Sequence, residues 1–141
     1  MKEERFKEIE RQVADADHMR LNSMLAPEFI SCDEEKSTSK IRFEIKDWER
    51  NQRGEGHGGA VSSMFDTAMG ITVMALSEAE AVSTADLSVS FIRPFLGKGC
   101  IIESEIIHPG KTLIRVSARA FDEDTGKCLA SASGNFVRLM R

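Results

Sequence analysis

The chain has 141 residues, 41% of them hydrophobic, a length typical of one domain with one buried core, so we expect a single domain over residues 1–141. With 19 basic against 23 acidic residues the net charge is −4, and the chain lacks the broad positive surface that holds a nucleic acid. Its three cysteines, Cys32, Cys100 and Cys128, are far apart and form no CxxC pair, so we expect buried, reduced thiols rather than disulfides or a metal site.

The first regular pattern lies in residues 1–24, an N-terminal helical segment. Phe6, Ile9 and Val13 repeat at helical spacing among charged residues, which indicates a surface helix with one narrow apolar stripe, and we expect a break near residues 15–17. The segment is charged from its second residue and lacks the apolar stretch and cleavage site of a secretory signal. We therefore expect the protein in the cytoplasm.

A strand pair and a polar loop follow. Pro27 ends the helical pattern, and residues 41–46 alternate between apolar and charged side chains, as in a half-buried strand paired with a shorter one at residues 28–32. Residues 47–59 read DWERNQRGEGHGG, a polar and glycine-rich stretch. We expect an ordered loop there, without regular structure.

Residues 60–80 predict a long central helix. Their apolar side chains follow i, i+3, i+4, i+7 spacing and fill most of the circumference, so the helix has to be enclosed by the rest of the chain. The longest apolar run, residues 68–76, is interrupted by Gly70 and Thr72 and is far short of the ~20 residues that span a membrane. We expect a core helix, and no membrane as a partner.

Four strand-like segments complete the chain and supply the enclosure. They lie near residues 81–93, 100–107, 113–122 and 128–139, and the last three are expected to form an antiparallel meander because their connections are short. The order of helix, two strands, long helix and four strands indicates an α+β fold, with one curled antiparallel sheet wrapped around a long central helix. This arrangement is the hotdog fold.

A motif around the start of the central helix carries a resemblance to a known family. Residues 51–59 end in His-Gly-Gly, Asp66 follows eight positions after Gly58, and residues 84–94 form a strand that ends in Arg-Pro. This combination resembles the PaaI-type acyl-CoA thioesterases of the hotdog superfamily. The resemblance covers residues 51–94 closely and the later strands loosely.

Asp66 is the first candidate for chemistry. It lies in an apolar helix, where burial of an ionised carboxylate costs several kcal/mol unless something compensates. It either faces a solvent gap, pairs with an arginine from a neighbouring strand, or acts as a general base or nucleophile. The resemblance implies the catalytic role, because the family places its catalytic Asp or Glu at this position.

Gly58 and Gly59 are candidates for an oxyanion site. With no side chains at a helix start, they leave first-turn N–H groups unpaired and accessible, with the positive end of the helix dipole behind them. A thioester carbonyl gains negative charge during attack, and a donor about 3 Å away stabilises that charge. The alternative is that both glycines serve only as a tight turn.

The spacing of these groups requires a second subunit. About 12 Å of helix separates Gly58 from Asp66, yet both have to lie about 3 Å from one thioester carbonyl. A symmetric homodimer, in which Asp66 of one subunit faces Gly58 of the other, resolves this and gives two equivalent sites. The resemblance implies the same shared sites, with the strand at residues 81–93 pairing with its own copy and with dimers often paired into a homotetramer.

Three further residues gain roles from the resemblance. Asn51 matches a position whose amide holds the substrate carbonyl or the attacking water, although it also suits an ordinary turn. Thr84 matches a hydroxyl that orients the nucleophilic water. His57 matches the histidine that positions the loop or contacts the thioester, and without an acidic partner visible in the sequence we expect a supporting role rather than a general base.

For substrate binding we single out Gly59 together with Arg93 and Lys111, whose charges suit the phosphates of coenzyme A, although each also suits a solvated surface position. The sequence and the resemblance together predict an acyl-CoA thioester hydrolase that needs no metal or other cofactor. Two alternatives stay open: a module that binds acyl-CoA without cleaving it, and a hydratase or dehydratase on the same fold.

Overall fold

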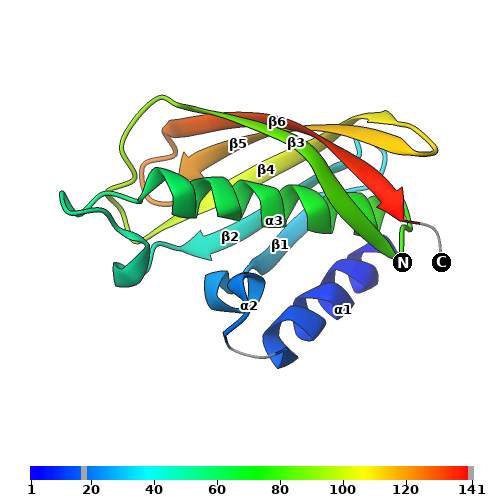
Figure 1. Ribbon diagram of the computed structural model, residues 1–141, viewed down its shortest axis with the longest axis horizontal. Helices are drawn as coiled ribbons and strands as arrows, with labels where there is room; N and C mark the ends of the chain where they lie inside the picture. The colour runs from blue at the N-terminus through cyan, green and yellow to red at the C-terminus, as the bar shows by residue number, and fades with distance from the viewer. Residues whose placement is uncertain (17–18, 140–141) are drawn as a thin grey trace.

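A six-stranded antiparallel sheet curls around one long helix (Figure 1). The computed structural model describes residues 1–16 and 19–139. The helices are α1 (Lys2–Asp15), α2 (Leu21–Leu25), the 3-10 helix η1 (Asp47–Glu49) and α3 (Gly58–Leu76). The strands are β1 (Glu28–Asp33), β2 (Thr38–Glu44), β3 (Ala81–Phe91), β4 (Gly99–Pro109), β5 (Leu113–Asp122) and β6 (Cys128–Leu139). The predicted α+β hotdog architecture is confirmed.

The strand order is β1-β2-β4-β5-β6-β3, which places β3 at the opposite edge of the sheet from β1. The predicted pairing of β1 with β2 and the predicted meander of β4, β5 and β6 are both confirmed. The chain leaves the sheet after β2, forms α3 and returns at the far edge as β3, which pairs with β6. As a result α3 lies against one face of the sheet, where it packs on β2, β4, β5, β6 and the edge strand β3 (Figure 1).

The helix α3 is enclosed because it is apolar on most of its circumference. Eleven of its residues are buried, and eight of these form one core with inward side chains of the sheet such as Phe43, Ile102 and Phe136. By length and composition α3 is the one helix in the described chain that could cross a membrane, but 61% of the relevant window is buried inside the molecule. Its apolar surface is already covered by the sheet and α1.

The helix α1 closes one side of the core and protects the edge strand β1. Phe6 is fully buried and stacks on Phe29 of β1, with ring centroids 4.8 Å apart. The Phe29 backbone N–H donates to the Glu10 carboxylate at 2.6 Å. At this point the edge strand therefore has a hydrogen-bond acceptor within its own chain. The predicted break in the helical segment is confirmed, since α1 ends at Asp15, while residue 17 lies outside the described residues.

The strand β3 is the open edge of the sheet. It has eleven residues, is largely exposed, and within the described chain pairs only with β6. Its register shifts between Thr84 and Asp86, a β-bulge that changes which side chains face the helix. Opposite the bulge, a Cβ on Gly134 would lie 2.8 Å from the Asp86 carbonyl oxygen, so the close approach of the two strands depends on glycine.

The three cysteines are free, and their burial predicts their reactivity. The expectation of buried thiols holds for Cys100, whereas Cys32 and Cys128 are only half-buried. Burial raises the pKa of the Cys100 thiol to about 12, which keeps it protonated near neutral pH, and the thiolate is the reactive form.

We expect an aromatic disulfide reagent to modify Cys128 in the native protein and Cys100 only after unfolding in urea, as measured by peptide mass. Native Cys100 that reacts as fast as Cys128 would contradict this.

Candidate functional site

The first turn of α3 leaves backbone N–H groups free. His57 caps the helix: its Nδ1 accepts a hydrogen bond from the Gly59 N–H at 2.9 Å, and its carbonyl accepts one from the Val61 N–H at 2.9 Å. The expectation that the Gly59 N–H is unpaired is therefore wrong, because the cap already occupies it. The N–H groups of Gly58 and Ala60 have no acceptor among the described residues, and Gly58 is the one of the two that lines the cavity described next, so its N–H is available to an oxyanion there.

Asn51 organises the loop that leads into α3. Its Oδ1 accepts hydrogen bonds from the backbone N–H groups of Arg53 at 2.9 Å and Glu55 at 3.1 Å, which makes it a turn residue. Its Nδ2 donates to the Glu55 carboxylate at 3.4 Å, and this contact, with Arg53 beside it, lowers the pKa of Glu55. The turn role that the sequence left open is thus present, and the Asn51 NH₂ is the part left to contact a substrate.

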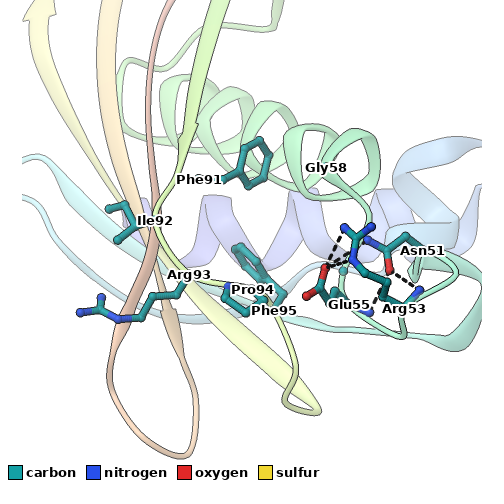
Figure 2. Close-up of a pocket in the computed structure, with 10 residues that line it drawn as sticks. Asn51, Arg53, Glu55, Gly58, Phe91, Ile92, Arg93, Pro94 and Phe95 are labelled. Atoms are coloured by element: carbon teal, nitrogen blue, oxygen red, sulfur yellow. Dashed lines mark hydrogen bonds and ion pairs between the residues drawn. The ribbon is translucent and has the colours of Figure 1, made fainter.

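A cavity of about 370 Å³ lies beside Gly58. One wall is the loop that contains Asn51, and the other is the end of β3 with the segment after it, residues 91–95 (Figure 2). The ring of Phe91 lies against the helix start, since a Cβ on Gly58 would be 3.5 Å from its Cζ. The cavity therefore joins the free donor, an amide side chain and an aromatic wall.

Asp66 and Thr84 form a second polar cluster about two turns further along α3. The Thr84 Oγ1 donates to the Asp66 Oδ1 at 2.6 Å. Asp66 is half-buried, and the ion pairs of the described chain involve other carboxylates. Its partner is thus a hydroxyl group rather than the arginine that the sequence left open. The bulge after Thr84 supports this contact by setting the side of β3 on which the hydroxyl lies.

Within one subunit the two clusters stay apart. Gly58 is the first residue of α3, and Asp66 follows about 12 Å along the helix axis. Asp66 and Thr84 lie outside the cavity described beside Gly58. The structure thus brings Asn51 together with Gly58, and Asp66 together with Thr84, but it does not bring the two pairs together in a single chain.

Of the two cations predicted to bind substrate, only Arg93 lies beside the cavity. Its Nη1 donates to the Cys128 carbonyl at 2.6 Å, and its side chain is directed away from the loop of Asn51 (Figure 2). Lys111 follows β4, which runs from Gly99 near the loop to the opposite end of the sheet, about 35 Å of strand. In the same subunit Lys111 is therefore remote from the cavity.

Two neighbours of Asn51 that the sequence did not single out hold the loop in place. Glu49 is buried, its Oε1 accepts the Lys46 N–H at 2.6 Å, and burial raises its pKa. Arg50 donates to three backbone carbonyls and forms a β-bridge with Gly56, so the loop is more regular than predicted. Charged residues in a polar loop usually mark solvated positions, and no sequence signal separates these two from such residues.

The chemistry available at these positions is that of an acid–base hydrolase. A carboxylate with a hydroxyl beside it can activate water, and a free helix N–H can hold an oxyanion. Within residues 1–16 and 19–139, no three His, Cys, Asp or Glu side chains come together in a way that could hold a metal ion.

Comparisons of sequence place the chain in a family. The model of the thioesterase superfamily matches residues 54–129, more than half of the chain. The protein named "Putative esterase SSO1253" from Saccharolobus solfataricus is 31% identical over 103 residues, which cover 73% of this chain and 68% of that protein.

Solved structures share the fold at low sequence identity. The PaaI protein of the phenylacetic acid degradation operon of E. coli superposes with a TM-score of 0.80 at 17% identity, over 97% of this chain and 95% of that one. Thioesterase superfamily member 2 from Mus musculus gives 0.80 at 18% identity over 96% of both chains. The protein smu.793 from Streptococcus mutans, solved bound to acetyl CoA, gives 0.71 at 19% identity over 82% and 90%. The sequence match and the shared fold agree, and the chain belongs to the thioesterase superfamily.

Proposed function

We propose that this chain is an acyl-CoA thioesterase, which hydrolyses an acyl- or aryl-CoA thioester to the free acid and CoA. The observation that carries the proposal is the 2.6 Å hydrogen bond between the Thr84 hydroxyl and the Asp66 carboxylate, which pairs a base with a group that can orient water. A protein of the same fold, smu.793, was solved bound to acetyl CoA, and this supports the substrate class. In this proposal the enzyme acts in the cytoplasm and uses no cofactor.

The proposed reaction begins with a water held between Asp66 and Thr84. Because Thr84 donates its own proton to Oδ1, its oxygen is free to accept a hydrogen bond from water, and Oδ2 of Asp66 accepts another. The water attacks the thioester carbon while Asp66 takes its proton, and the Gly58 N–H of the partner subunit stabilises the oxyanion. The C–S bond then breaks, and Asp66 returns the proton to the sulfur of CoA. Direct attack by Asp66 on the same carbon is the second route to the same products.

The remaining site residues have supporting roles in this proposal. The Asn51 NH₂ contacts the substrate carbonyl, and His57 keeps the first turn of α3 capped so that the Gly58 N–H stays in place. Arg93 lies beside the cavity, where a CoA phosphate could displace its contact with the Cys128 carbonyl.

A homodimer completes the site in this proposal, and β3 forms its interface. A long edge strand without a partner is a template for pairing with another chain. Exposed apolar side chains gather where β3 ends beside the cavity: Phe91 is 50% exposed, Ile92 54% and Leu96 63%. Pairing of β3 with its own copy about a two-fold axis would cover this edge and bring Asp66 to the Gly58 of the partner subunit.

Mixed dimers test the shared site directly. Asp66→Asn and Gly58→Pro, each inactive alone, are denatured together in equal amounts and refolded. A mixed dimer then has one doubly damaged site and one intact site, and half of the dimers are mixed, so about a quarter of the wild-type rate of CoA release should return. If both groups act within one chain, mixing restores nothing. Sedimentation of each variant alone is the control for assembly.

A further inference from the structure

The loop that positions Gly58 has little regular structure of its own. Between β2 and α3 the chain forms only the short helix η1 and the bridge from Arg50 to Gly56. Yet an oxyanion donor has to be held to within a fraction of an ångström, because a displacement of about 1 Å can cost about 10²-fold in rate. Something other than helix or sheet must therefore hold this loop.

The Arg50 side chain sits where three segments of backbone meet. Its Nη1 donates to the Gly54 carbonyl at 2.9 Å, and its Nη2 donates to the Ile45 carbonyl at 3.0 Å and to the Gly97 carbonyl at 2.9 Å. Ile45 directly follows β2, Gly54 lies in the loop itself, and Gly97 lies in the connection from β3 to β4. One guanidinium group thus joins the loop to two parts of the sheet framework.

These contacts connect the two walls of the cavity. The loop wall contains Asn51 and Gly56, and the opposite wall leads through Pro94 and Phe95 to Gly97. The Gly56 N–H donates to the Phe95 carbonyl at 2.8 Å, and a Cβ on Gly56 would lie 2.8 Å from the Phe95 Cβ. The walls are therefore in contact at Gly56, and Arg50 fixes the same two segments from a second point.

Arg50 is next in sequence to a buried carboxylate, Glu49, whose pKa its charge lowers, but within the described chain the hydrogen bonds of the Arg50 guanidinium all go to carbonyl groups. The ion pairs of the described chain do not include it, whereas Arg53, three positions later, pairs with Glu55 at 3.0 Å. A planar guanidinium presents several donors in a fixed fork, which a lysine ammonium cannot reproduce across three separate carbonyls. The geometry suits a structural clamp.

We propose that Arg50 is a positioning residue of the thioesterase site, which holds residues 51–58 against the connection from β3 to β4 so that the Gly58 N–H meets the thioester oxygen. This inference rests on the proposed function. Arg50 itself touches neither substrate nor reacting atoms, and it acts through the loop.

The test is Arg50→Met, with guanidinium ion as the probe. We expect kcat for CoA release to fall about 10- to 100-fold with a smaller change in KM, because the donor is misplaced while the groups that bind substrate remain. Guanidinium chloride, well below the concentration that unfolds the variant, should restore part of kcat. Amide hydrogen exchange at Gly56 and His57 should become faster, since the Gly56 N–H bonds to the Phe95 carbonyl on the opposite wall and the His57 N–H bonds to the carbonyl of Glu49, next to Arg50.

Arg42→Met is the matched control. Arg42 is also partly buried, but its guanidinium pairs with Glu123 at 2.6 Å and with Glu28 at 3.2 Å, and none of these three residues lines the cavity. Its loss should lower the thermal midpoint and leave kcat, and the exchange of Gly56 and His57, unchanged. Guanidinium should then have no effect on its rate.

The outcomes separate the inference from the proposed function. Wild-type kcat in Arg50→Met, or a lower kcat with neither rescue nor faster exchange, overturns the role of Arg50. If Arg50→Met does not fold, Arg50→Lys takes its place, and a lysine variant equal to wild type in kcat and exchange overturns it as well. If the wild-type protein releases no CoA from any acyl-CoA, the proposed function fails, while faster exchange would still show the clamp.

Discussion

Replacement of Asp66 by asparagine is expected to lower kcat for CoA release on the order of 10³-fold, with the fold and the proposed dimer intact. Asparagine has nearly the same shape, and its oxygen can still accept the Thr84 hydroxyl that Asp66 accepts at 2.6 Å. What is lost is the basic oxygen that takes a proton from water. Thiol release from a panel of acyl-CoAs, with circular dichroism and sedimentation on the same samples, measures this.

Asp33→Asn is the control for this substitution. Asp33 ends β1, at the sheet edge opposite β3, and its Oδ1 accepts the Lys36 N–H at 3.1 Å, which asparagine can also do. Its kcat should equal that of the wild type. A wild-type rate in Asp66→Asn would exclude the catalytic role of this carboxylate. Tight binding of acyl-CoA without thiol release, in wild type and variant alike, would instead identify a binding module.

Replacement of Gly58 by proline is expected to lower kcat about 10²- to 10³-fold, because it removes the backbone N–H proposed to hold the oxyanion. Proline is well tolerated at the first position of a helix, where its missing N–H has no helical acceptor. The residue before it is also compatible, since His57 has φ −65° and ψ 135°, the extended region that proline favours. The helix start should therefore survive the loss of the donor.

Gly58→Ala separates the donor from the space around it. A Cβ there would lie 3.5 Å from the Phe91 ring, an ordinary contact, and the N–H is retained. Its loss of kcat should be far smaller than that of Gly58→Pro. Equal losses in the two variants would mean that the space at Gly58 matters and that its N–H does not.

The architecture could be predicted from the sequence because its signals are long and repeated. The apolar surface of α3 extends over nineteen residues and has to be enclosed, and the segments that follow it have the pattern of strands. The alternation at Ile41 and Phe43 gave the inward face of β2 directly, and both side chains are buried. Each of these patterns contains enough residues to distinguish the period of a helix, about 3.6 residues, from the period of a strand, about two residues.

The details of the site depend on single contacts that no pattern encodes. Arg50 and Arg53 both stand in the same polar loop, yet one binds three carbonyls and the other pairs with Glu55 near the surface. The capping of Gly59 by His57 is likewise a choice of one rotamer, which removes a donor that the sequence left free. The contact of Arg50 with Gly97 depends on how distant segments meet, and the cap on Gly59 depends on the rotamer of a neighbouring side chain. The identity of the residues specifies neither.

In the proposed enzyme the strand β3 has two roles. It carries the hydroxyl that contacts Asp66, and it is also the edge on which a second copy would pair. Dissociation would then expose the strand and disable the reaction in the same event, without any separate regulatory part. Under that arrangement the specific activity depends on the protein concentration, because only paired molecules are active.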